Sequence, residues 1–408
     1  MTLIYITFLS LLGALLALDL LFLNRGSHAI GVAKALRQTA MWFCVAVAFN
    51  VGVFFLYDNH VAGLGGRTPA AIEPGQPPVV AAAAADPRPH DALIPENGRE
   101  AAVMFFQGYL LEFMLSLDNM MVIAMIMTFF RVPAQFQHRV LFWGILGAVV
   151  LRGLLIAAGA ALVSRFDWIL YVFGAFLVYS SIKLLRAGEE EAPDLDKNVV
   201  VRAARRLLNV TKDYHGSAFF VRFNGALAAT PMLLVLLCVE FADVIFAVDS
   251  IPAIFGTTLD PFLVLTSNCF AILGLRSLYF AVAALTSKFR YLKYSMIAIL
   301  AFIGVKMLLP ILDEFEATRA IGLPTHLSPY ASLATIGALM LVGLVASFTS
   351  GSQEQSNGTA EAANTPAKRA ANGVETTDAP TAPPLARAQE IKPDAAITES
   401  PMTERTHG

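Results

Sequence analysis

The chain has 408 residues, of which 56% are hydrophobic and 15% are charged, and its mean hydropathy is +0.62. Soluble domains carry roughly 25% charged residues, so this composition indicates a protein that lies largely within a lipid bilayer. The formal net charge of −2 gives no electrostatic case for nucleic-acid binding, which needs a basic face.

Apolar segments of the length that crosses a hydrocarbon core, about 20 helical residues, recur along the chain. They lie near 1–23, 39–57, 101–130, 140–163, 168–186, 231–255, 261–285, 294–311 and 329–349. The first has no basic stretch before it and no small-residue cleavage site, so we expect a retained span rather than a signal peptide. The sequence therefore predicts an all-α, polytopic bundle of about nine membrane spans.

The basic residues between these segments predict the orientation of the chain, because Lys and Arg are enriched in cytoplasmic loops. With the N-terminus outside, the inner loops carry Arg25, Lys34, Arg37, Arg131, Arg139, Arg186, Lys197, Arg202, Arg205, Arg206, Lys212, Arg222, Lys288, Arg290 and Lys293. The outer loops carry only Arg67, Arg88, Arg99, Arg165 and Arg319. We therefore expect an outside N-terminus and a cytoplasmic C-terminus.

The composition divides the chain into four parts. Residues 1–57 hold two N-terminal spans, and residues 58–98 form an Ala/Pro-rich outer loop that we expect to be flexible. Residues 99–349 form the core, which includes a cytoplasmic loop at 187–224, and residues 350–408 form a polar tail that we expect to be disordered. Within the cytoplasmic loop, VVVRAARRLL indicates a basic helix resting on the inner membrane surface.

An internal repeat runs through the core. Glu112, Asp118 and Asn119 are spaced as Asp243, Asp249 and Ser250 are. Three further matches keep the same order: Leu151-Arg152-Gly153 with Leu275-Arg276-Ser277, Ser164-Arg165-Phe166 with Ser287-Lys288-Phe289, and Lys183-Leu184-Leu185 with Lys306-Met307-Leu308. Each copy has three spans, at 101–186 and 231–311, and an odd number inverts the second copy. The pattern predicts a 3+3 inverted-topology repeat followed by a last span at 329–349.

Acidic residues lie inside the predicted spans, where an ionised side chain costs a few kcal/mol or more and is usually paired or functional. They are Glu112, Asp118, Glu240, Asp243 and Asp249. Ion pairing with the mid-span residues Arg152 and Arg276 would balance the charge of at most two of them. A bound cation, or protons exchanged for one, would account for the remainder.

Neutral oxygen-bearing residues accompany the acids, namely Asn119, Ser250, Thr266, Ser267 and Asn268. An all-oxygen set suits hard ions such as magnesium, calcium or manganese. The methionines at 114, 120, 121, 125 and 127 are expected to fill apolar space, and Cys44, Cys238 and Cys269, which lack CxxC spacing, are expected to be small buried residues.

The span at 231–255 allows two conformations near its end. Thr230 as the cap and Pro231 at the first position place Glu240 and Asp243 near mid-span. If the helix unwinds between Asp249 and Pro252, freed carbonyl groups would join the carboxylates as ligands. If it stays helical, Asp249 lies near the outer end of the span and is hydrated.

Five segments carry a resemblance to a known family: GYLLEFMLSLDNMMV, RVLFWGILGAVVLRGLLI, FDWILYVFGAFLVYSSIKLL, VEFADVIFAVDSIPAIF and DPFLVLTSNCFAILGLRSLYF. Over roughly residues 1–345 the chain resembles the TerC (tellurium-resistance protein C) family, and within it the Alx-like branch. By position, the family's acidic motifs match Glu112, Asp118, Asn119, Glu240, Asp243, Asp249 and Ser250, and its arginines match Arg152 and Arg276. The long 58–98 loop, the tail, and Met120 with Met121 depart from the family's usual pattern.

The resemblance implies a bacterial inner-membrane protein associated with tellurite, alkaline or metal stress and, in the Alx-like branch, with manganese export. Our first hypothesis is accordingly a secondary carrier that exports manganese(II), with no resident cofactor and with protons as possible coupling ions. The alternative is a membrane scaffold or protein-insertion factor of a stress-response complex, in which the acids are structural. No motif of an ATP-driven pump or membrane protease occurs, so we do not expect an enzyme.

Overall fold

A computed structural model describes residues 2–19, 31–65, 91–186, 210–211, 213–223, 226–285, 292–314, 327–347 and 349. The chain divides into two compact units, Met1–Glu354 and Gln355–Gly408, and every described residue belongs to the first. The central part of the expected outer loop, all of the expected basic helix near 199–208, and the tail from 350 onward lie outside the described residues.

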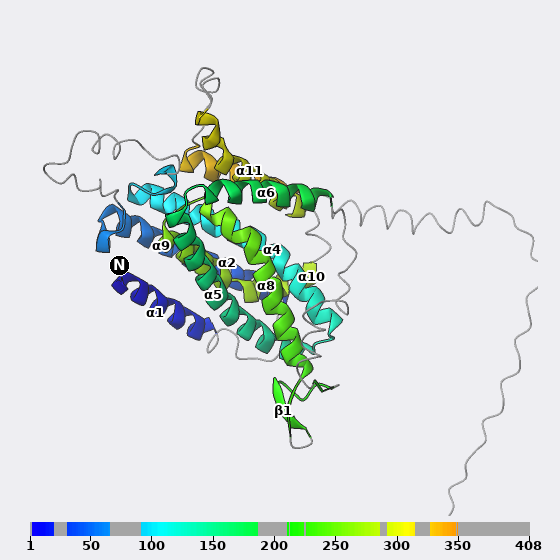
Figure 1. Cartoon of the computed structure of the whole chain (residues 1–408). Coiled ribbons are helices and arrows are strands. Elements are labelled where there is room, and N and C mark those ends of the chain that lie inside the picture. The colour runs from blue at the N-terminus through cyan, green and yellow to red at the C-terminus, as the bar shows by residue number, and fades with distance from the viewer. Residues whose placement is uncertain are drawn as a thin grey trace, which may run out of the picture. The chain divides into compact units, whose positions relative to one another are not determined.

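Helices make up nearly all of the described unit (Figure 1). They are α1 (Thr2–Leu18), α2 (Val32–Asp58), α4 (Gly98–Phe129), α5 (Ala134–Arg165), α6 (Ile169–Arg186), α8 (Pro231–Phe255), α9 (Pro261–Leu273), α10 (Leu275–Leu285), α11 (Leu292–Leu308) and the unlabelled helix Pro329–Ser347. Short 3₁₀ turns lie at Val61–Gly63, Asp91–Leu93 and Leu309–Glu314.

Length and composition identify the helices that can cross a membrane. Among the described residues, 7 helices qualify, or 8 if α9 and α10 form one broken span. The first expected span, near 1–23, corresponds to α1, an apolar helix of 17 residues that is shorter than a typical span. The protein is an all-α, polytopic membrane protein.

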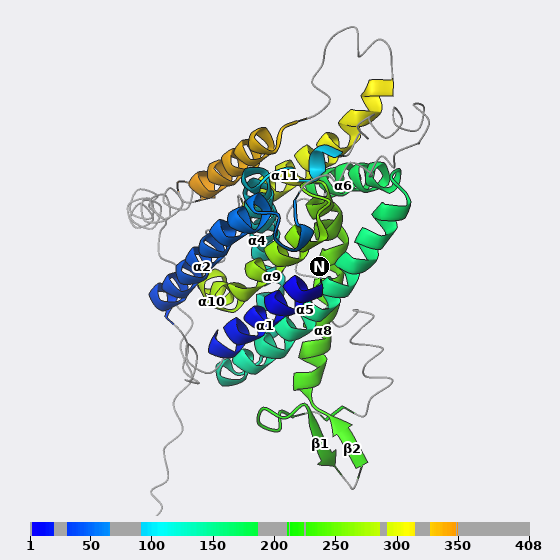
Figure 2. The ribbon, with the colours of Figure 1, turned by 90° about the vertical axis from the view of Figure 1, so that its left-hand side faces the viewer.

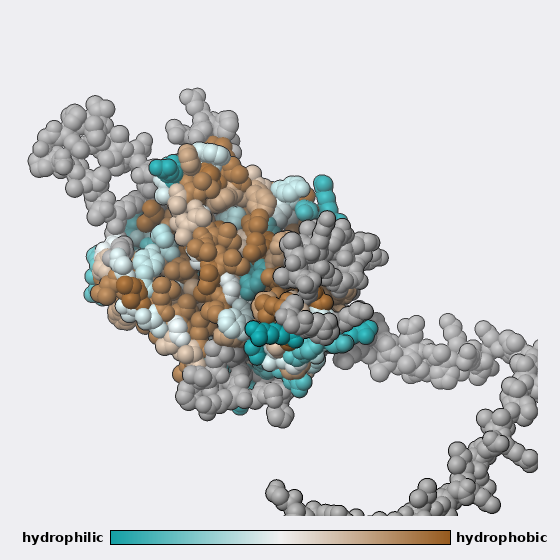
Figure 3. Space-filling model, turned by 60° about the horizontal axis from the view of Figure 1, so that its bottom comes forward, coloured by the Kyte–Doolittle hydropathy of each residue, from teal (hydrophilic) through white to brown (hydrophobic). Residues whose placement is uncertain are grey.

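Large apolar side chains on the outside of the bundle face the surroundings. Val150 and Leu154 of α5, and Leu341 and Val342 of the last helix, are each more than half exposed. Figure 3 shows apolar surface across much of one face of the molecule. An apolar exterior of this kind is expected of a protein whose solvent is lipid.

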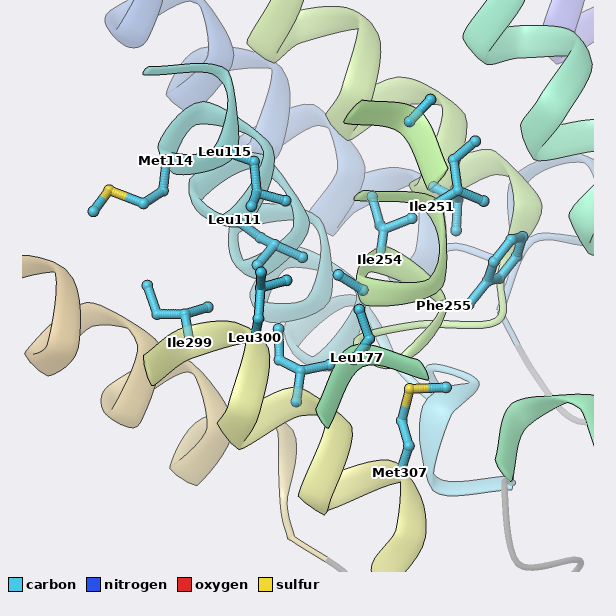
Figure 4. Packing of buried hydrophobic residues seen from close by; sticks show 14 of the residues in the cluster. Leu111, Met114, Leu115, Leu177, Ile251, Ile254, Phe255, Ile299, Leu300 and Met307 are labelled. Atoms are coloured by element: carbon cyan, nitrogen blue, oxygen red, sulfur yellow. The ribbon is translucent and has the colours of Figure 1, made fainter. Parts of the chain in front are cut away.

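The centre of the bundle is built from helices of both halves of the core. α4 packs on α8 and α9, α5 packs on α8, and α6 lies alongside α11 (Figures 1 and 2). α2 packs on α4 and on α10. The apolar core between these layers includes Leu111 of α4, Ile254 of α8 and Leu300 of α11 (Figure 4).

Two glycines allow α6 and α11 to approach backbone to backbone. A Cβ atom added to Gly304 would lie 2.8 Å from the Gly174 carbonyl oxygen, and one added to Gly174 would lie 3.0 Å from the Gly304 carbonyl oxygen. Small residues are the usual means of close helix packing in membranes, where no hydrophobic force drives helices together. The α6–α11 contact therefore depends on both glycines.

The position of the break differs from the one considered from sequence. α8 is continuous from Pro231 to Phe255, with Pro252 in its last turn, so the helical reading of this span holds. The next span is the one that breaks, because the axis turns by 56° between Pro261–Leu273 and Ser277–Ala283. Gly274 lies at this bend.

The start of α8 agrees with the sequence prediction in position but not in its hydrogen bond. The backbone of Thr230 is extended, and Pro231 occupies the first helical position. The Thr230 hydroxyl does not cap the helix; it donates to the Ala218 carbonyl at 2.6 Å. The N-terminal end of α8 is therefore fastened to the preceding loop.

That loop contains a two-stranded antiparallel sheet that the sequence prediction missed. β1 (Phe220–Phe223) pairs with β2 (Ala226–Ala229), with Phe220 opposite Ala229. Nearby, Tyr214 donates its hydroxyl to the Phe130 carbonyl at 2.7 Å, and burial raises the pKa of this phenol. The contact ties the loop to the C-terminal end of α4.

The α6–α11 contact predicts the effect of a larger side chain. Gly304→Leu should lower the free energy of unfolding by about 1–3 kcal/mol, because overpacking forces the two helices apart. The midpoint of thermal unfolding of the detergent-solubilised protein measures this. Gly153→Leu is the control, since a Cβ at Gly153 meets nothing within 4 Å; equal midpoints for the two variants would contradict the close contact.

Candidate functional site

A buried arginine joins the two halves of the core. Arg152 of α5 donates from Nε to Asp243 Oδ2 at 3.1 Å and from Nη2 to Asp243 Oδ1 at 2.8 Å. Its Nη1 donates to Glu112 Oε1 of α4, which also accepts from the Ser116 hydroxyl at 3.3 Å. Each half therefore contributes one carboxylate to the same guanidinium.

The three side chains of this cluster are largely removed from solvent, which strengthens their mutual attraction and limits the geometries they can adopt. Glu112 is 1% exposed and Arg152 is 2% exposed, while Asp243 is 12% exposed. The planar guanidinium matches a carboxylate with two parallel hydrogen bonds, which a lysine ammonium does not do. The three side chains fix α4, α5 and α8 relative to one another.

Glu240 lies one helical turn before Asp243 on α8 and rests against α5 at Gly147. A Cβ added to Gly147 would overlap the Glu240 carboxyl group, so only glycine allows this approach. The Glu240 Oε2 atom is buried, and in the part of the chain that the structure describes it has no hydrogen-bond partner. A buried carboxyl oxygen without a partner is costly unless a proton or a cation compensates it.

The charge of these four side chains does not balance. Ionised Glu112, Glu240 and Asp243 contribute three negative charges, and Arg152 contributes one positive charge, which leaves two negative charges. In the described part of the chain, no three acidic, histidine or cysteine residues are grouped so that they could hold a metal ion. Arg152 occupies the space between Glu112 and Asp243 instead.

Asp249, the second Asp of the second motif, makes its contact away from Arg152. Asp249 accepts a hydrogen bond from the Ser180 hydroxyl of α6 at 2.8 Å. Asp243 and Asp249 are six residues apart, so they face different sides of a continuous α8. Asp118 is half-buried on α4, and Asn119 is buried beside it. The structure thus divides the predicted site residues between two regions.

The neutral oxygen donors are buried but differ in their hydrogen bonds. Thr266 and Ser267 donate to the Phe262 and Leu263 carbonyls of their own helix, both at 2.7 Å. Asn268 donates to the Val264 carbonyl at 3.3 Å. The Ser250 hydroxyl, by contrast, is buried without a partner. Ser250 is therefore the hydroxyl of this group that has unused hydrogen-bonding capacity.

Two expectations about other residues can be compared with the structure. Cys238 and Cys269 are buried as expected, but Cys44 is exposed on α2, so that expectation was wrong for Cys44. Its place in an apolar segment did not distinguish a core position from a surface that faces lipid. Arg276 is the second residue of α10, but its side chain lies outside the described residues.

Sequence reasoning missed three buried polar positions. Ser180 was not singled out from the sequence, but its hydroxyl donates to Asp249. Gln107 is 0% exposed, and neither of its amide atoms has a hydrogen-bond partner among the described residues. Lys306 served only as a marker of the repeat, yet it is 9% exposed and its Nζ donates to the Gly256 carbonyl at 3.2 Å. Polar residues inside apolar segments are the signal that would have found all three.

Removing the guanidinium should destabilise the bundle. In Arg152→Gln, two buried carboxylates lose their partner, so the free energy of unfolding should fall by about 3–5 kcal/mol. Arg152→Lys should fall between the parent and Arg152→Gln, because it keeps the charge without the paired hydrogen bonds. Thermal unfolding in detergent, with Asp243→Asn added as a rescue of Arg152→Gln, measures the effect; a fully stable Arg152→Gln protein would show that the cluster does not support the fold.

Comparison with known proteins relates this chain to a family. Residues 97–355 match the integral membrane protein TerC family. An Escherichia coli (strain K12) protein provisionally named membrane-bound redox modulator Alx is 44% identical over 310 residues, which cover 76% of this chain and 86% of that protein. An uncharacterized membrane protein of Myxococcus xanthus is 38% identical over 342 residues, which cover 84% and 90% of the two chains.

A plant protein is also similar. The chloroplastic thylakoid membrane protein TERC of Arabidopsis thaliana is 43% identical over 259 residues, which cover 64% of each chain. No solved structure matches the chain. The family match spans more than half of the sequence, and the bacterial relatives are similar over most of their length. The chain therefore belongs to the TerC family of integral membrane proteins.

Proposed function

We propose that this protein is a secondary carrier of divalent cations and that its cargo is manganese(II), exported across a bacterial inner membrane. The observation that carries the proposal is the buried cluster of Glu112, Asp243, Glu240 and Arg152, which retains two negative charges when its carboxyls are ionised. A single divalent cation would neutralise that remainder. Carboxylate oxygens are also the ligands that hard divalent ions prefer.

Arg152 has a defined role in this proposal. In the described conformation its guanidinium supplies positive charge between Glu112 and Asp243. An arriving cation competes for the same oxygens, and Arg152 turns away as the cation binds. When the cation leaves, Arg152 returns and keeps the empty site from holding uncompensated charge, which would be costly inside the bilayer.

Glu240 and Asp249 of α8 provide further carboxyl groups for the cation or for protons. The Glu240 carboxyl, held at Gly147, accepts a proton or joins the cation as a ligand. Asp249, with Ser250 and with Asp118 and Asn119 of α4, provides oxygen ligands on other faces of the helices. The hydrogen bond from Ser180 holds Asp249 until a cation replaces it.

The carrier would work through an inverted repeat of α4–α6 and α8–α11, within a fold of nine spans that counts α1 and the α9–α10 pair. The packing supports this symmetry, because α4 rests on α9 as α8 rests on α5, and because α6 and α11 pack on each other. Exchange of two such halves around a central site is a common mechanism of alternating access.

Metal export can be tested in manganese-loaded cells. Cells that express the parent chain should accumulate less manganese than cells expressing Asp118→Asn or Asp249→Asn at matched membrane abundance, because each change removes one ligand charge. Intracellular manganese by mass spectrometry is the measurement. Equal manganese in all three strains would reject manganese export, and loss of a stress phenotype only when the 187–224 loop or the tail is deleted would favour the scaffold alternative.

A matched pair of glycine variants sharpens the same experiment. Gly147→Ala displaces the Glu240 carboxyl without changing any charge, so export should fall severalfold. Gly153→Ala, six residues further along α5, adds the same methyl group where nothing lies within 4 Å, and export should stay at the parent level. Equal export by the two variants would remove Glu240 from the transport site.

The proposed orientation has an outside N-terminus and a cytoplasmic C-terminus, supported by the distribution of basic residues. In a chain with Cys44, Cys238 and Cys269 replaced, Val61→Cys should react with a membrane-impermeant thiol reagent in intact cells. His215→Cys should react only after the cells are permeabilised. The opposite pattern of labelling would reverse the orientation.

A further inference from the structure

The end of the bundle at which α4 begins and α8 ends contains buried polar groups that the proposed carrier mechanism does not use. Gln107 of α4 is 0% exposed, and neither its Oε1 nor its Nε2 has a hydrogen-bond partner among the described residues. An amide without partners in an apolar interior costs several kcal/mol. Buried groups of this kind are normally satisfied by water or by a ligand.

Gln107 faces the interior rather than lipid. It lies four residues before Leu111 on α4, and residues at this spacing share one face of a helix. Leu111 projects into the core that it shares with Ile254 of α8 and Leu300 of α11 (Figure 4). Gln107 therefore lies one turn beyond this apolar layer, about 6 Å further toward the end of the bundle.

Lys306 reaches the same end from α11. It lies six residues beyond Leu300, and its ammonium donates to the carbonyl of Gly256, which is two residues beyond Ile254. An ammonium has three donors, and among the described residues Gly256 is the acceptor that contacts it. No carboxylate of the described residues forms an ion pair with Lys306.

The turn that follows α8 is fastened to the segment that precedes α4. Thr257 and Thr258 are buried, and the Thr258 hydroxyl and the Leu259 amide both donate to the Leu93 carbonyl, at 3.1 and 2.9 Å. The segment before α4 therefore covers the turn between α8 and α9. The nearby Asp260 carboxylate caps α9 by accepting from the amides of Phe262 and Leu263, at 2.9 and 3.2 Å.

We propose that the outer ends of α4, α8 and α11 enclose a water-containing chamber, lined by Gln107 and Lys306, that admits water and small anions and repels divalent cations. Water satisfies both the donor and the acceptor of the Gln107 amide and the free donors of Lys306, which a metal ion would not. The Lys306 charge then opposes the return of a cation from outside. This last consequence rests on the proposed export function, but the chamber itself does not.

Thiol chemistry tests the chamber without any transport assay. In the chain with its three native cysteines replaced, Gln107→Cys is treated in intact cells with anionic and cationic methanethiosulfonate reagents of similar size. Both should react, and the ratio of the anionic to the cationic rate should fall severalfold when Lys306→Met is added, because the lysine charge attracts the anionic reagent and repels the cationic one. Lys306→Arg should keep the parent ratio.

Three control positions make the outcomes decisive. Val61→Cys, exposed near the end of α2, should react with both reagents at rates that Lys306→Met leaves unchanged. Leu110→Cys, packed in the apolar cluster of α1, α2 and α9, should not react. Lys183→Met, which removes the exposed counterpart of Lys306 on α6, should leave the Gln107→Cys ratio unchanged.

Two results would overturn the proposal. If Gln107→Cys is as unreactive as Leu110→Cys while Val61→Cys is labelled, no water reaches the chamber. If Gln107→Cys reacts but its rate ratio is the same with Lys306 and with Lys306→Met, the lysine charge does not act there. Absence of manganese export with the expected labelling would reject the proposed function and leave the chamber established.

Discussion

An arginine held between two carboxylates inside the bilayer is the constraint on which the centre of this protein depends. Charges interact far more strongly in a low-dielectric interior than in water, and an uncompensated charge is correspondingly costly. Glu112, Arg152 and Asp243 lie on α4, α5 and α8, so each helix must be placed for the other two. The pairing also joins α4 and α5 to α8, which follows them only after a long loop, and makes these parts of the core electrostatically dependent on each other.

Small residues lie at two of the close helix contacts in the bundle. The Glu240 carboxyl reaches its position against α5 because Gly147 has no side chain, and Gly174 and Gly304 let the backbones of α6 and α11 approach each other. Membrane helices gain little from burying apolar surface against one another, since lipid is equally apolar. Close backbone approach and polar contacts therefore determine which helices meet, and the glycines are as necessary to the site as the acids are.

The sequence predicted well the features that depend on local chemistry. Apolar length located the core helices to within a few residues, Pro231 marked the start of α8, and charged residues in apolar segments identified the buried acids. Which acid pairs with Arg152, and which meets Ser180, depends on tertiary packing that spacing does not contain. The two-stranded sheet was not predicted, although Asn224-Gly225 in the sequence is a strong signal for a two-residue turn. A break was considered near Pro252 because proline interrupts helices, whereas a single glycine such as Gly274 is a weaker signal.

The bend at Gly274 makes α5 and the α9–α10 pair mechanically unequal. α5 is a single helix of 32 residues, whereas the broken span consists of α9 with 13 residues and α10 with 11. A continuous helix resists bending along its whole hydrogen-bonded length, while a joint between two short helices can change its angle by altering few backbone dihedrals. α5 should therefore move as a rigid helix, whereas α9 and α10 can change their relative angle. A movement that involves both regions would bend the chain mainly at Gly274.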